Sequence, residues 1–497
     1  MMDLTIREIA EACGGKLFSV EETDSDSYVS SVVIDSRMVE PRGVFIATIG
    51  ERVDGHSFIR TAFDQGAILA VAQKTPETVE KENGPGKSWG SYLLVEDSFQ
   101  ALKDIAEAYR RKLSVKVVGI TGSVGKTSTK EFIAGVLSEK YRVLKTEGNF
   151  NNEVGVPLTL LRIRREHQAA VVEMGISDFG EMHRLSKMAR PDVCVMTNIG
   201  QSHLNNLIDR DGILKAKSEI FDYMAEDGVI CLNGEDDKLS PIREIRGHRP
   251  HFFGLGKNPE EEVYLTDIKG RGLLGSDAAL VIRNSPDQGA GNRSGESGRA
   301  GQTSAGGTQT RTPVHIPLPG EHMVLNAAAA ACVANVLGLT EKETAAGIAR
   351  VSSVSGRTNI IKMSDYTIID DCYNANPASM KAAVELLAMA DTEKVAILGD
   401  MLNLGVETDQ YHGEIGSLAA RLGIDRIHCV GELSRHMYRE AVEQGKDRIK
   451  ASWFPDTNAL LEQIAAGRAD LVPGGSTVLI KASHDIGFAG VLEALCN

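Results

Sequence analysis

The chain has 497 residues, of which 42% are hydrophobic and 25% are charged, and its formal net charge at pH 7 is −14. This length is too great for one hydrophobic core and indicates about three domains. The acidic balance argues against a nucleic-acid-binding surface, which usually carries a basic stripe. The seven cysteines include no Cys-x-x-Cys pair, which fits a reducing compartment better than a disulfide framework or a zinc site.

The N-terminal residues do not read as a signal peptide, and no apolar run approaches the ~18 residues that a membrane-spanning helix needs. We therefore expect a cytoplasmic protein that neither inserts into a membrane nor binds nucleic acid. Our expectation for its oligomeric state is a monomer.

Short strands and helices alternate over residues 1–112, which we expect to form an N-terminal α/β domain. A polar stretch at 80–88 reads as a loop. The strands are expected at 31–35 and 43–47, and the helices at 57–65 and 99–112.

Residues 113–350 contain several apolar strands that end at polar residues. Near-continuous apolar strands separated by helical segments are typical of a parallel sheet covered on both faces. Ligands of such sheets bind at the carboxyl ends of the strands, so the strand-end residues Glu173, Asn198 and Asn233 are candidates for a site. These strands are expected at 169–174, 193–198 and 228–233.

The stretch at 119–130 reads Gly-Ile-Thr-Gly-Ser-Val-Gly-Lys-Thr-Ser-Thr-Lys. It follows an apolar strand expected over 115–120 and precedes 131–141, where apolar side chains recur at helical spacing. Strand, glycine-rich turn, Gly-Lys-Thr and helix together predict a phosphate-binding loop. The strict pattern of such loops has a glycine where this chain has Ile120. The alternative is a glycine-rich turn in which a lysine occurs by chance, and the flanking strand and helix disfavour it. The residues expected to form this phosphate-binding loop are Thr121, Gly122, Ser123, Val124, Gly125, Lys126, Thr127 and Ser128.

Apart from two prolines, residues 284–313 contain no apolar side chain larger than alanine. Such a segment cannot offset its own ordering entropy, so we expect a disordered loop insertion between two hairpin strands. Residues 351–497 return to alternating strands and helices and predict an open Rossmann-like sheet without a dinucleotide fingerprint. Its strands are expected at 367–370, 394–398, 426–430 and 477–481, and its helices near 378–389, 408–422, 432–444 and 456–466.

Phosphoryl transfer to a carboxylate brings two anions together, so a site for it must supply cations and hold the geometry. Lys126 offers a point charge and Thr127 a hydroxyl for Mg²⁺. Glu173 and His203, which follow successive strands, are candidate metal ligands. Taken on their own, these two residues more often serve as a helix cap and a solvent-exposed histidine.

Four further stretches carry a family pattern. They read Thr-Asn-Ile-Gly-Gln-Ser-His at 197–203, Lys-Ala-Lys-Ser-Glu-Ile-Phe at 215–221, Leu-Pro-Gly-Glu-His-Met-Val-Leu-Asn at 318–326 and Val-Ser-Gly-Arg at 354–357. They resemble the Mur ligases, ATP-dependent amide-forming enzymes of peptidoglycan precursor synthesis. The resemblance covers nearly the whole chain apart from 284–313. It implies an α/β fold of three domains: a UDP-substrate domain at 1–112, an ATP-binding domain at 113–350 and a Rossmann-like domain at 351–497.

The resemblance also implies roles for single residues. Thr127, Glu173 and His203 would position Mg²⁺, and Lys217 matches a lysine that the family carbamylates to N6-carboxylysine, which would add a metal-binding anion. Asn326 would contact the adenine nucleoside. Arg357 and Asp371 would close over the γ-phosphate and the ribose, and the rigid fork of an arginine suits a phosphate. The residues implied as catalytic are Lys126, Lys217, Glu173, His203 and Arg357.

The stretches at 148–161, 370–377 and 398–405, with Asp-Ser-Arg at 35–37 and Asp-Gly-His at 54–56, resemble family members that join D-alanyl-D-alanine to UDP-N-acetylmuramoyl-tripeptide. The implied reaction moves the γ-phosphoryl group of ATP to the tripeptide carboxylate, and the amine of the dipeptide then attacks the acyl phosphate. Turn chemistry or an ordinary surface is the alternative role for several of the implied contacts. The residues implied to bind substrates are Ser36, Arg37, Asn151, Asn152, Tyr373, Asn374 and Asn376.

Other readings stay open at this stage. A sister ligase that adds the third amino acid, or a folylpolyglutamate-type ligase, would share the scaffold, and a nucleotide switch would share the phosphate loop. One departure stands out: where many relatives read Lys-Gly-Ser-Arg, this chain reads Lys-Ala-Ser-His at 481–484. A neutral histidine carries no fixed charge, so any anion contact of the arginine is in doubt for His484.

Overall fold

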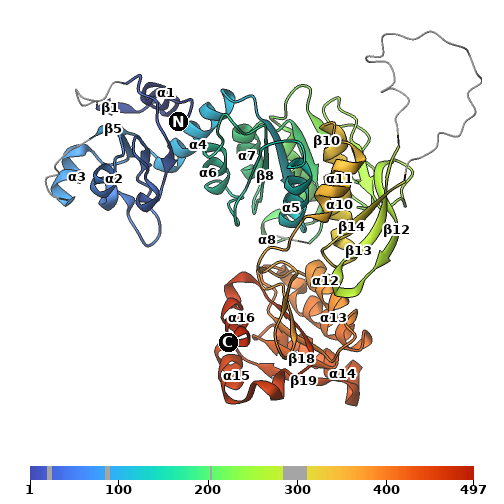
Figure 1. The fold of residues 1–497 in the computed structure, drawn as a ribbon. Helices are drawn as coiled ribbons and strands as arrows, with labels where there is room; N and C mark the ends of the chain where they lie inside the picture. The colour runs from blue at the N-terminus through green and yellow to red at the C-terminus, as the bar shows by residue number, and fades with distance from the viewer. Residues whose placement is uncertain (19–24, 84–89, 202–203, 284–310) are drawn as a thin grey trace, which may run out of the picture. The chain divides into compact units, whose positions relative to one another are not determined.

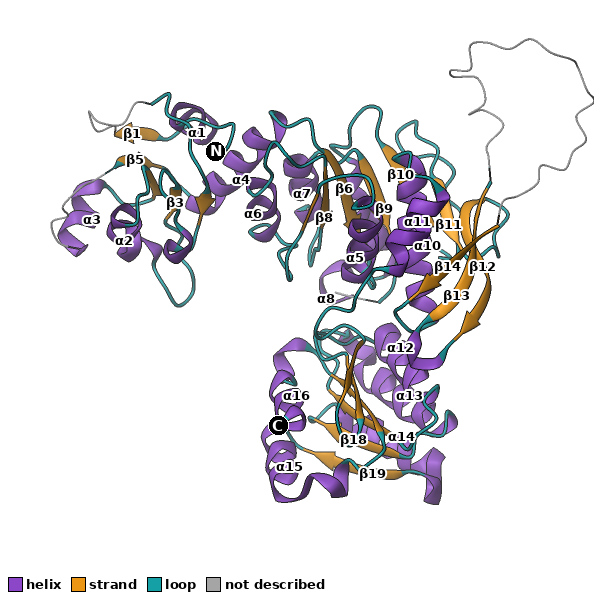
Figure 2. Cartoon of the chain, viewed as in Figure 1, coloured by secondary structure: helices purple, strands orange, loops and turns teal. Residues whose placement is uncertain are grey.

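The computed structural model describes residues 1–18, 25–83, 90–201, 204–283 and 311–497. Its described residues form three β-sheets with helices packed around them (Figure 1), and helices and strands alternate along most of the chain (Figure 2). This confirms the expected mixed α/β fold with three sheet-containing domains.

The N-terminal sheet has five strands in the order β1-β5-β4-β3-β2. Strands β2 to β5 pair in parallel, and β1 runs antiparallel to β5 at one edge. Its buried core includes Phe45, Ile59, Ala70 and Tyr92. The elements are α1 (Ile6–Cys13), β1 (Lys16–Phe18), β2 (Val32–Val33), β3 (Val44–Ile46), α2 (Ile59–Asp64), β4 (Leu69–Ala72), α3 (Pro76–Asn83), β5 (Ser91–Leu94) and α4 (Ser98–Arg111).

The central sheet has nine strands in the order β14-β13-β12-β11-β10-β9-β6-β8-β7. It is parallel over β6, β7 and β8 and again over β10 to β12, and an antiparallel pair, β13 and β14, completes one edge. Its strands are β6 (Lys116–Thr121), β7 (Val143–Lys145), β8 (Ala169–Glu173), β9 (Val193–Met196), β10 (Val229–Asn233), β11 (His251–Gly254), β12 (Glu261–Gly270), β13 (Ser276–Ile282) and β14 (Arg311–Ile316). Its helices are α5 (Lys126–Leu137), α6 (Gly155–Leu161), α7 (Glu181–Ala189), α8 (Leu204–Leu207), α9 (Arg210–Ser218), α10 (Glu321–Val336) and α11 (Glu341–Ala349).

Two expectations for this region need correction. The predicted insertion at 284–313 is too long, because Arg311 to Pro313 already belong to β14 and pair with β13; residues 284–310 lie outside the described residues. The helix after the phosphate loop begins at Lys126 and not at Glu131. Its first turn is polar and therefore carries no apolar periodicity.

The C-terminal sheet has six strands in the order β15-β16-β20-β17-β18-β19, all parallel except β15. Alternate residues of one strand enter different cores: Leu479 packs beneath α12 to α14, whereas Val478 and Ile480 pack beneath α15 and α16. The elements are β15 (Asn359–Lys362), β16 (Thr367–Asp370), α12 (Pro377–Ala388), β17 (Lys394–Gly399), α13 (Thr408–Arg421), β18 (Arg426–Val430), α14 (Ser434–Gly445), β19 (Lys450–Phe454), α15 (Thr457–Leu471), β20 (Thr477–Lys481) and α16 (Ala489–Cys496).

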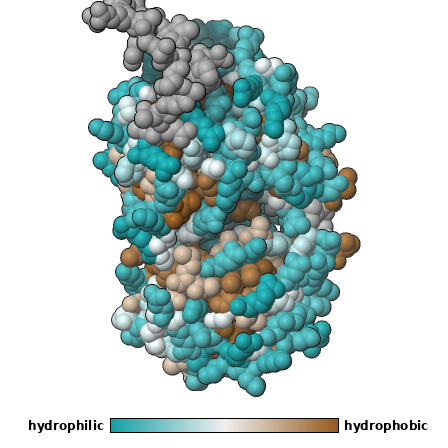
Figure 3. Space-filling model, turned by 90° about the vertical axis from the view of Figure 1, so that its right-hand side faces the viewer, coloured by the Kyte–Doolittle hydropathy of each residue, from teal (hydrophilic) through white to brown (hydrophobic). Residues whose placement is uncertain are grey.

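By its internal contacts the chain divides into two compact units. One comprises Met1–Thr121, Tyr141–Cys194 and Lys217–Gly228, and the other comprises Gly122–Lys140, Val195–Ala216 and Val229–Asn497. The domain boundaries predicted near 112 and 350 stay predictions. On the face drawn in Figure 3, hydrophilic residues predominate and hydrophobic residues gather in a few small groups. Among the helices that the structure describes, none is both long and apolar enough to cross a membrane.

Candidate active site

Two glycines shape the phosphate loop between β6 and α5. Gly122 has a φ of +149°, and a Cβ added there would lie 1.9 Å from the Oγ1 of Thr197. Gly125 is the N-cap of α5 with a φ of +84°, and a Cβ there would lie 3.0 Å from the Oδ1 of Asn326. Both positions therefore require glycine, because the loop backbone runs directly against neighbouring side chains.

The loop is held by the residues that follow β9. The side chain of Asn198 accepts from the amide of Val124 and donates to its carbonyl, each at 2.9 Å. The Thr197 hydroxyl donates to the same carbonyl at 2.7 Å, and the Ser123 amide donates to the Asn198 carbonyl at 3.0 Å. The amides of Ser123 and Val124 are thus already used within the protein. A phosphate would meet the amides that follow them, in the first turn of α5, for which the helix itself has no acceptor.

The charged and polar groups of the loop lie at the start of α5. The ammonium of Lys126 donates to the Gly122 carbonyl at 2.8 Å. The Thr127 side chain is 8% exposed. Asn326 is also buried and accepts from the Thr129 hydroxyl at 3.1 Å, so it packs on α5 beside the loop. A helix N-terminus, a lysine and a hydroxyl in one turn suit the phosphates of ATP and its Mg²⁺.

Thr121, the last residue of β6, lies deeper in the structure than the rest of the phosphate loop. Its side chain is fully buried, and its hydroxyl oxygen has no hydrogen-bond partner among the residues that the structure describes. Buried polar groups are normally paired. The Thr121 hydroxyl is an exception to this rule, and the predicted part of Thr121 in phosphate binding stays a prediction.

Glu173 ends β8 and is 1% exposed. Its backbone amide donates to the Thr146 hydroxyl at 3.0 Å, and its carboxylate accepts from the side chain of Asn151 at 2.9 Å. Asn151 is fixed in turn, because its carbonyl accepts from the amide of Gly175 at 2.8 Å. Asn151, predicted as a substrate contact, therefore also orients the predicted metal ligand.

The neighbouring Asn152 has a local role in this structure. Its side chain accepts from the amides of Val154 and Gly155, at 3.1 and 2.9 Å, at the start of α6. This is the turn chemistry that short amide side chains commonly provide. Its predicted contact with substrate stays a prediction.

Lys217 lies in α9 and is 2% exposed. His203 lies outside the described residues. Within the described parts of the chain, no three His, Cys, Asp or Glu side chains gather in a way that could hold a metal ion. Mg²⁺ commonly relies on one or two protein oxygens together with substrate phosphates, so the protein need not form a cage for it.

The predicted C-terminal residues meet at the ends of β16 and β20. The guanidinium carbon of Arg357 lies 3.9 Å from the centre of the Tyr373 ring, which also contacts the ring of His484 at 5.6 Å between centroids. Asp371 pairs with the ammonium of Lys481 at 2.6 Å. Lys481, for which the sequence suggested no role, also donates to the Asn374 carbonyl at 2.9 Å.

Asn376 is the N-cap of α12. Its side chain accepts from the amide of Ser379 at 2.9 Å in a capping box, and Pro377 follows it in the first turn. The structure thus provides the turn chemistry that the sequence analysis named as an alternative. Its predicted contact with the dipeptide stays a prediction.

The N-terminal candidates differ in exposure. Ser36 is 8% exposed, whereas the side chain of Arg37 is 86% exposed and pairs with Asp35 at 2.6 Å. The hydrogen bond from Arg37 lowers the pKa of Asp35. Arg37 therefore stands in solvent, where it can meet an anionic ligand.

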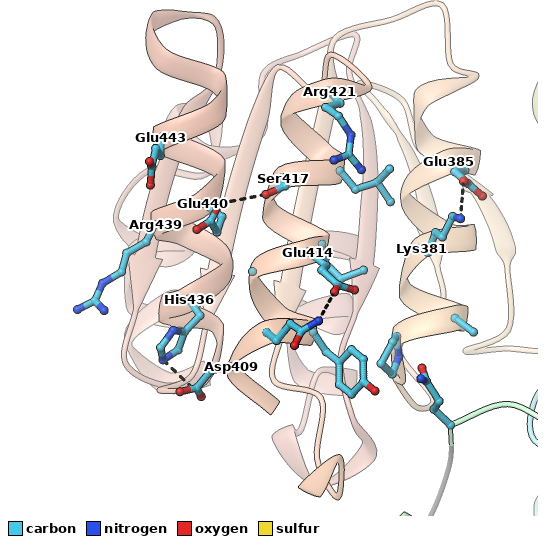
Figure 4. Close-up of a pocket in the computed structure, with 18 residues that line it drawn as sticks. Lys381, Glu385, Asp409, Glu414, Ser417, Arg421, His436, Arg439, Glu440 and Glu443 are labelled. Atoms are coloured by element: carbon cyan, nitrogen blue, oxygen red, sulfur yellow. Dashed lines mark hydrogen bonds and ion pairs between the residues drawn. The ribbon is translucent and has the colours of Figure 1, made fainter. Parts of the chain in front are cut away.

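An open groove of about 950 Å³ lies along three helices of the C-terminal region (Figure 4). Its charged side chains are mixed in sign, and several pair with each other, among them Lys381 with Glu385 and His436 with Asp409. None of the predicted site residues that the structure describes lines this groove. It is therefore separate from the residues predicted to carry the chemistry.

The sequence analysis missed the residues that hold other site residues in position. Asn198 was noticed only as a strand-end polar residue, yet its side chain binds both the backbone amide and the backbone carbonyl of Val124. Thr146 and Asp370 orient predicted site residues, and the sequence analysis gave neither of them a role, although Asp370 begins the family-like stretch at 370–377. The position of Asn198 and Asp370 at the carboxyl ends of parallel strands is the one signal that could have found them.

Comparison with known protein families matches three successive parts of the chain to Mur ligase domains. Residues 28–110 match the family model "Mur ligase family, catalytic domain", residues 120–334 the "Mur ligase middle domain", and residues 356–484 the "Mur ligase, glutamate ligase domain".

Individual relatives match over nearly their full length. The chain is 32% identical to the UDP-N-acetylmuramoyl-tripeptide–D-alanyl-D-alanine ligase of Bacillus subtilis, covering 100% of this chain and 99% of that protein. It superposes on a crystal structure of MurF from Acinetobacter baumannii with a TM-score of 0.81, 29% identity and coverage of 99% and 98%. The MurF ligase of Thermotoga maritima in complex with ADP gives a TM-score of 0.74, 28% identity and coverage of 93% and 96%. With its phosphate loop, its three sheets and these full-length matches, the chain belongs to the Mur ligase family of ATP-dependent, ADP-forming ligases.

Proposed function

We propose that this protein joins D-alanyl-D-alanine to UDP-N-acetylmuramoyl-tripeptide in the cytoplasmic stage of peptidoglycan synthesis. The observation that carries the proposal is a phosphate loop within a chain that aligns end to end with relatives named UDP-N-acetylmuramoyl-tripeptide–D-alanyl-D-alanine ligase. The γ-phosphoryl group of ATP moves to the terminal carboxylate of the tripeptide and leaves ADP. The neutral amine of the dipeptide attacks the acyl phosphate, the new amide forms, and inorganic phosphate leaves.

The first step depends on the start of α5. The amides of Gly125 to Ser128 and the ammonium of Lys126 hold the phosphates, for which Lys126 exchanges its present contact with the Gly122 carbonyl. Arg357 supports the charge that develops on the transferred group, as arginines do in phosphoryl transfer. Asn326 contacts the adenine nucleoside from beside the loop, and Asp371 the ribose.

Mg²⁺ is held by Thr127 and Glu173, with His203 and a carbamylated Lys217 completing the set. When bound, the ion supplies positive charge that offsets the repulsion between the phosphate and the tripeptide carboxylate. The burial of Lys217 supports its modification, because an ammonium out of water is unfavourable. Reaction of the neutral amine with CO₂ forms a carbamate and releases a proton, which turns this position into an oxygen ligand.

The remaining predicted residues bind the two acceptor molecules. Ser36 and the exposed Arg37 contact the UDP portion of the nucleotide substrate, and Arg37 supplies charge for its diphosphate. Asn151 and Asn152 contact the nucleotide-tripeptide. Tyr373, Asn374 and Asn376 form the turn that receives the dipeptide.

A substrate panel tests the proposal. Purified protein is mixed with Mg-ATP and one of three carboxylate substrates: UDP-N-acetylmuramoyl-tripeptide, the UDP-linked dipeptide or a folate. Phosphate release is followed with D-alanyl-D-alanine, with single amino acids and with glutamate. Release that requires the nucleotide-tripeptide and the dipeptide together supports the proposal. Release with the UDP-linked dipeptide and a single amino acid, or with a folate and glutamate, would assign the protein to one of the sister ligases.

Two further properties belong to the proposal. We place the protein in the cytoplasm, where ATP is available, and cell fractionation with an antibody to the native chain tests this. We also propose that it acts as a monomer, because each predicted role is filled by a residue of one chain. Size-exclusion chromatography with light scattering at working concentration tests the oligomeric state.

A further inference from the structure

Arg357 sits in a tight turn whose backbone is unusual. The Arg357 amide donates to the Val354 carbonyl at 2.9 Å, and Gly356 has a φ of +75°, as a type II turn requires at its third position. The next residue, Thr358, is buried and has a φ of +48°. A β-branched residue rarely adopts this conformation, and it persists only where its surroundings hold it. We call residues 354–358 the arginine turn.

Two neighbouring carboxylates hold the arginine turn on either side of Arg357. The Gly356 amide donates to Asp370 at 2.7 Å, and the Thr358 amide donates to Asp371 at 3.0 Å. Asp370 is fully buried. It also accepts from the Cys372 thiol at 3.1 Å, and burial, with this hydrogen bond, raises the pKa of Cys372 to about 12. The cysteine therefore remains a hydrogen-bond donor at neutral pH.

Lys481 fixes the second carboxylate. Strands β16 and β20 are parallel neighbours with Asp370 opposite Ile480, so the residues that follow them, Asp371 and Lys481, come together. The Lys481 side chain is 2% exposed, and its ammonium contacts Asp371 at 2.6 Å and the Asn374 carbonyl at 2.9 Å. One buried cation thus ties the arginine turn to the turn that carries Tyr373 and Asn374.

Tyr373 closes the arrangement from the other side. Its amide donates to the Gly356 carbonyl at 3.1 Å, and its ring lies against the Arg357 guanidinium at 3.9 Å. A Cβ added to Gly356 would lie 3.1 Å from the Tyr373 Cβ, so the two turns are in close contact. The guanidinium therefore has a defined direction although no described carboxylate forms an ion pair with it.

We propose that Asp370 and Lys481 are positioning residues of the ligase reaction, which hold the arginine turn so that Arg357 points at the transferred phosphoryl group. The proposal rests on the phosphate-binding role of Arg357 in the proposed function. In this proposal Asp371 binds the arginine turn and Lys481, in addition to any contact that it makes with ATP. The turn must be rigid because a misplacement of about 1 Å at such a group can lower a rate by about a hundredfold.

A double-mutant cycle tests the proposal. Asp370→Asn keeps the size of the side chain but turns one acceptor into a donor, which faces either the Gly356 amide or the Cys372 group. We expect it to lower kcat by about ten- to a hundredfold while KM for ATP changes by less than about threefold. On an Arg357→Lys background, the same change should lower kcat by less than about twofold, because the group that it positions is already impaired. Lys481→Met should behave in the same way.

Asp400→Asn is the matched control. Asp400 is a buried carboxylate just after the neighbouring strand β17, and it accepts from the amide and hydroxyl of Ser434 at 2.7 and 2.6 Å. It caps α14 and does not touch the arginine turn, so its effect should combine multiplicatively with that of Arg357→Lys. Multiplicative effects for Asp370→Asn as well would overturn the proposal, since they indicate a purely structural role.

A second measurement does not depend on turnover. Hydrogen exchange of the Gly356 and Thr358 amides should be slow in the wild-type protein and at least about tenfold faster in Asp370→Asn and Lys481→Met, but unchanged in Asp400→Asn. Fast exchange in the wild-type protein would refute the clamped turn. A wild-type protein that releases no phosphate with the dipeptide but protects both amides would refute the proposed function and retain the clamp. Variants that do not fold leave the wild-type exchange rates to decide.

Discussion

Replacing Gly122 by alanine, which exchanges one hydrogen atom for a methyl group, should weaken the binding of ATP strongly. The added Cβ would lie 1.9 Å from the Thr197 Oγ1, closer than real Cβ atoms approach, and 3.1 Å from the Thr197 Cβ, which is a tight contact. Thr197 must therefore move, and its hydrogen bond to the Val124 carbonyl breaks. The backbone φ of +149° is also a region that side chains other than glycine rarely adopt.

The size of the effect follows from these two contributions. Placing a non-glycine residue in such a backbone region costs about 1–3 kcal/mol. Losing one hydrogen bond costs about 1 kcal/mol. In the free protein the loop can shift to relieve both, so most of the combined ~2–4 kcal/mol is borne by the ATP-bound state. We expect the affinity for Mg-ATP to fall by a factor of about 30 to 700.

Isothermal titration calorimetry with Mg-ATP measures the affinity, and circular dichroism confirms that each variant is folded. Gly423→Ala is the control, because Gly423 has a positive φ of +70° but no atom within 4 Å of an added Cβ, and it should bind ATP as the wild type does. Thr197→Ala isolates the hydrogen-bond share, with an expected loss of about tenfold or less. A Gly122→Ala protein that binds ATP within about threefold of the wild type would show that the loop is not confined as described.

Three further outcomes are expected. Lys126→Ala should abolish phosphate release in the substrate panel without lowering the melting temperature, and full activity would exclude its phosphate contact. In protein supplied with carbon-13 bicarbonate, we expect a carbamate signal that is absent from Lys217→Ala. Lys130→Arg, which changes another buried lysine, should keep the signal. A signal that is unchanged in Lys217→Ala contradicts the modification. Burial lowers the pKa of His428 to about 4, so below pH ~6.5 the unfolded chain binds a proton that the folded chain does not. The unfolding free energy should therefore fall by about 3 kcal/mol between pH ~6.5 and ~4, and denaturant unfolding of His428→Asn should lack this part of the slope; equal slopes would refute it.

The parallel strands were the easiest part of the fold to predict. Strands β16, β18 and β20 begin and end where the sequence indicated, because both faces of these central strands are buried and their apolar runs stop at polar residues. The edge strands β15 and β19 were missed. Their side chains are mostly half-exposed, so their sequences carry neither a continuous apolar run nor a clear alternation.

The candidate site divides in a similar way. The phosphate loop is local: its glycines, Lys126 and Thr127 are adjacent in sequence and could be read directly. The groups that hold it are distant, since Asn198 lies 74 residues from Val124. The same holds for Lys481, which lies 110 residues from Asp371. Partners separated by such distances are joined by the order of strands in a sheet, and no sequence pattern encodes that order directly.

The phosphate loop and the arginine turn are built on one physical principle. Each presents a cation from a backbone that only a few hydrogen bonds hold in place, and those bonds come from side chains just past the ends of parallel strands. In the loop the holding group is the neutral amide of Asn198, which accepts and donates at once. In the arginine turn it is a pair of carboxylates, and Lys481 offsets the charge of one of them. A bare carboxylate pair beside Arg357 would draw the guanidinium away from a phosphate, because two opposite charges at such short range attract strongly. Lys481 therefore has two effects: it orients Asp371, and it leaves Arg357 available to bind an anion.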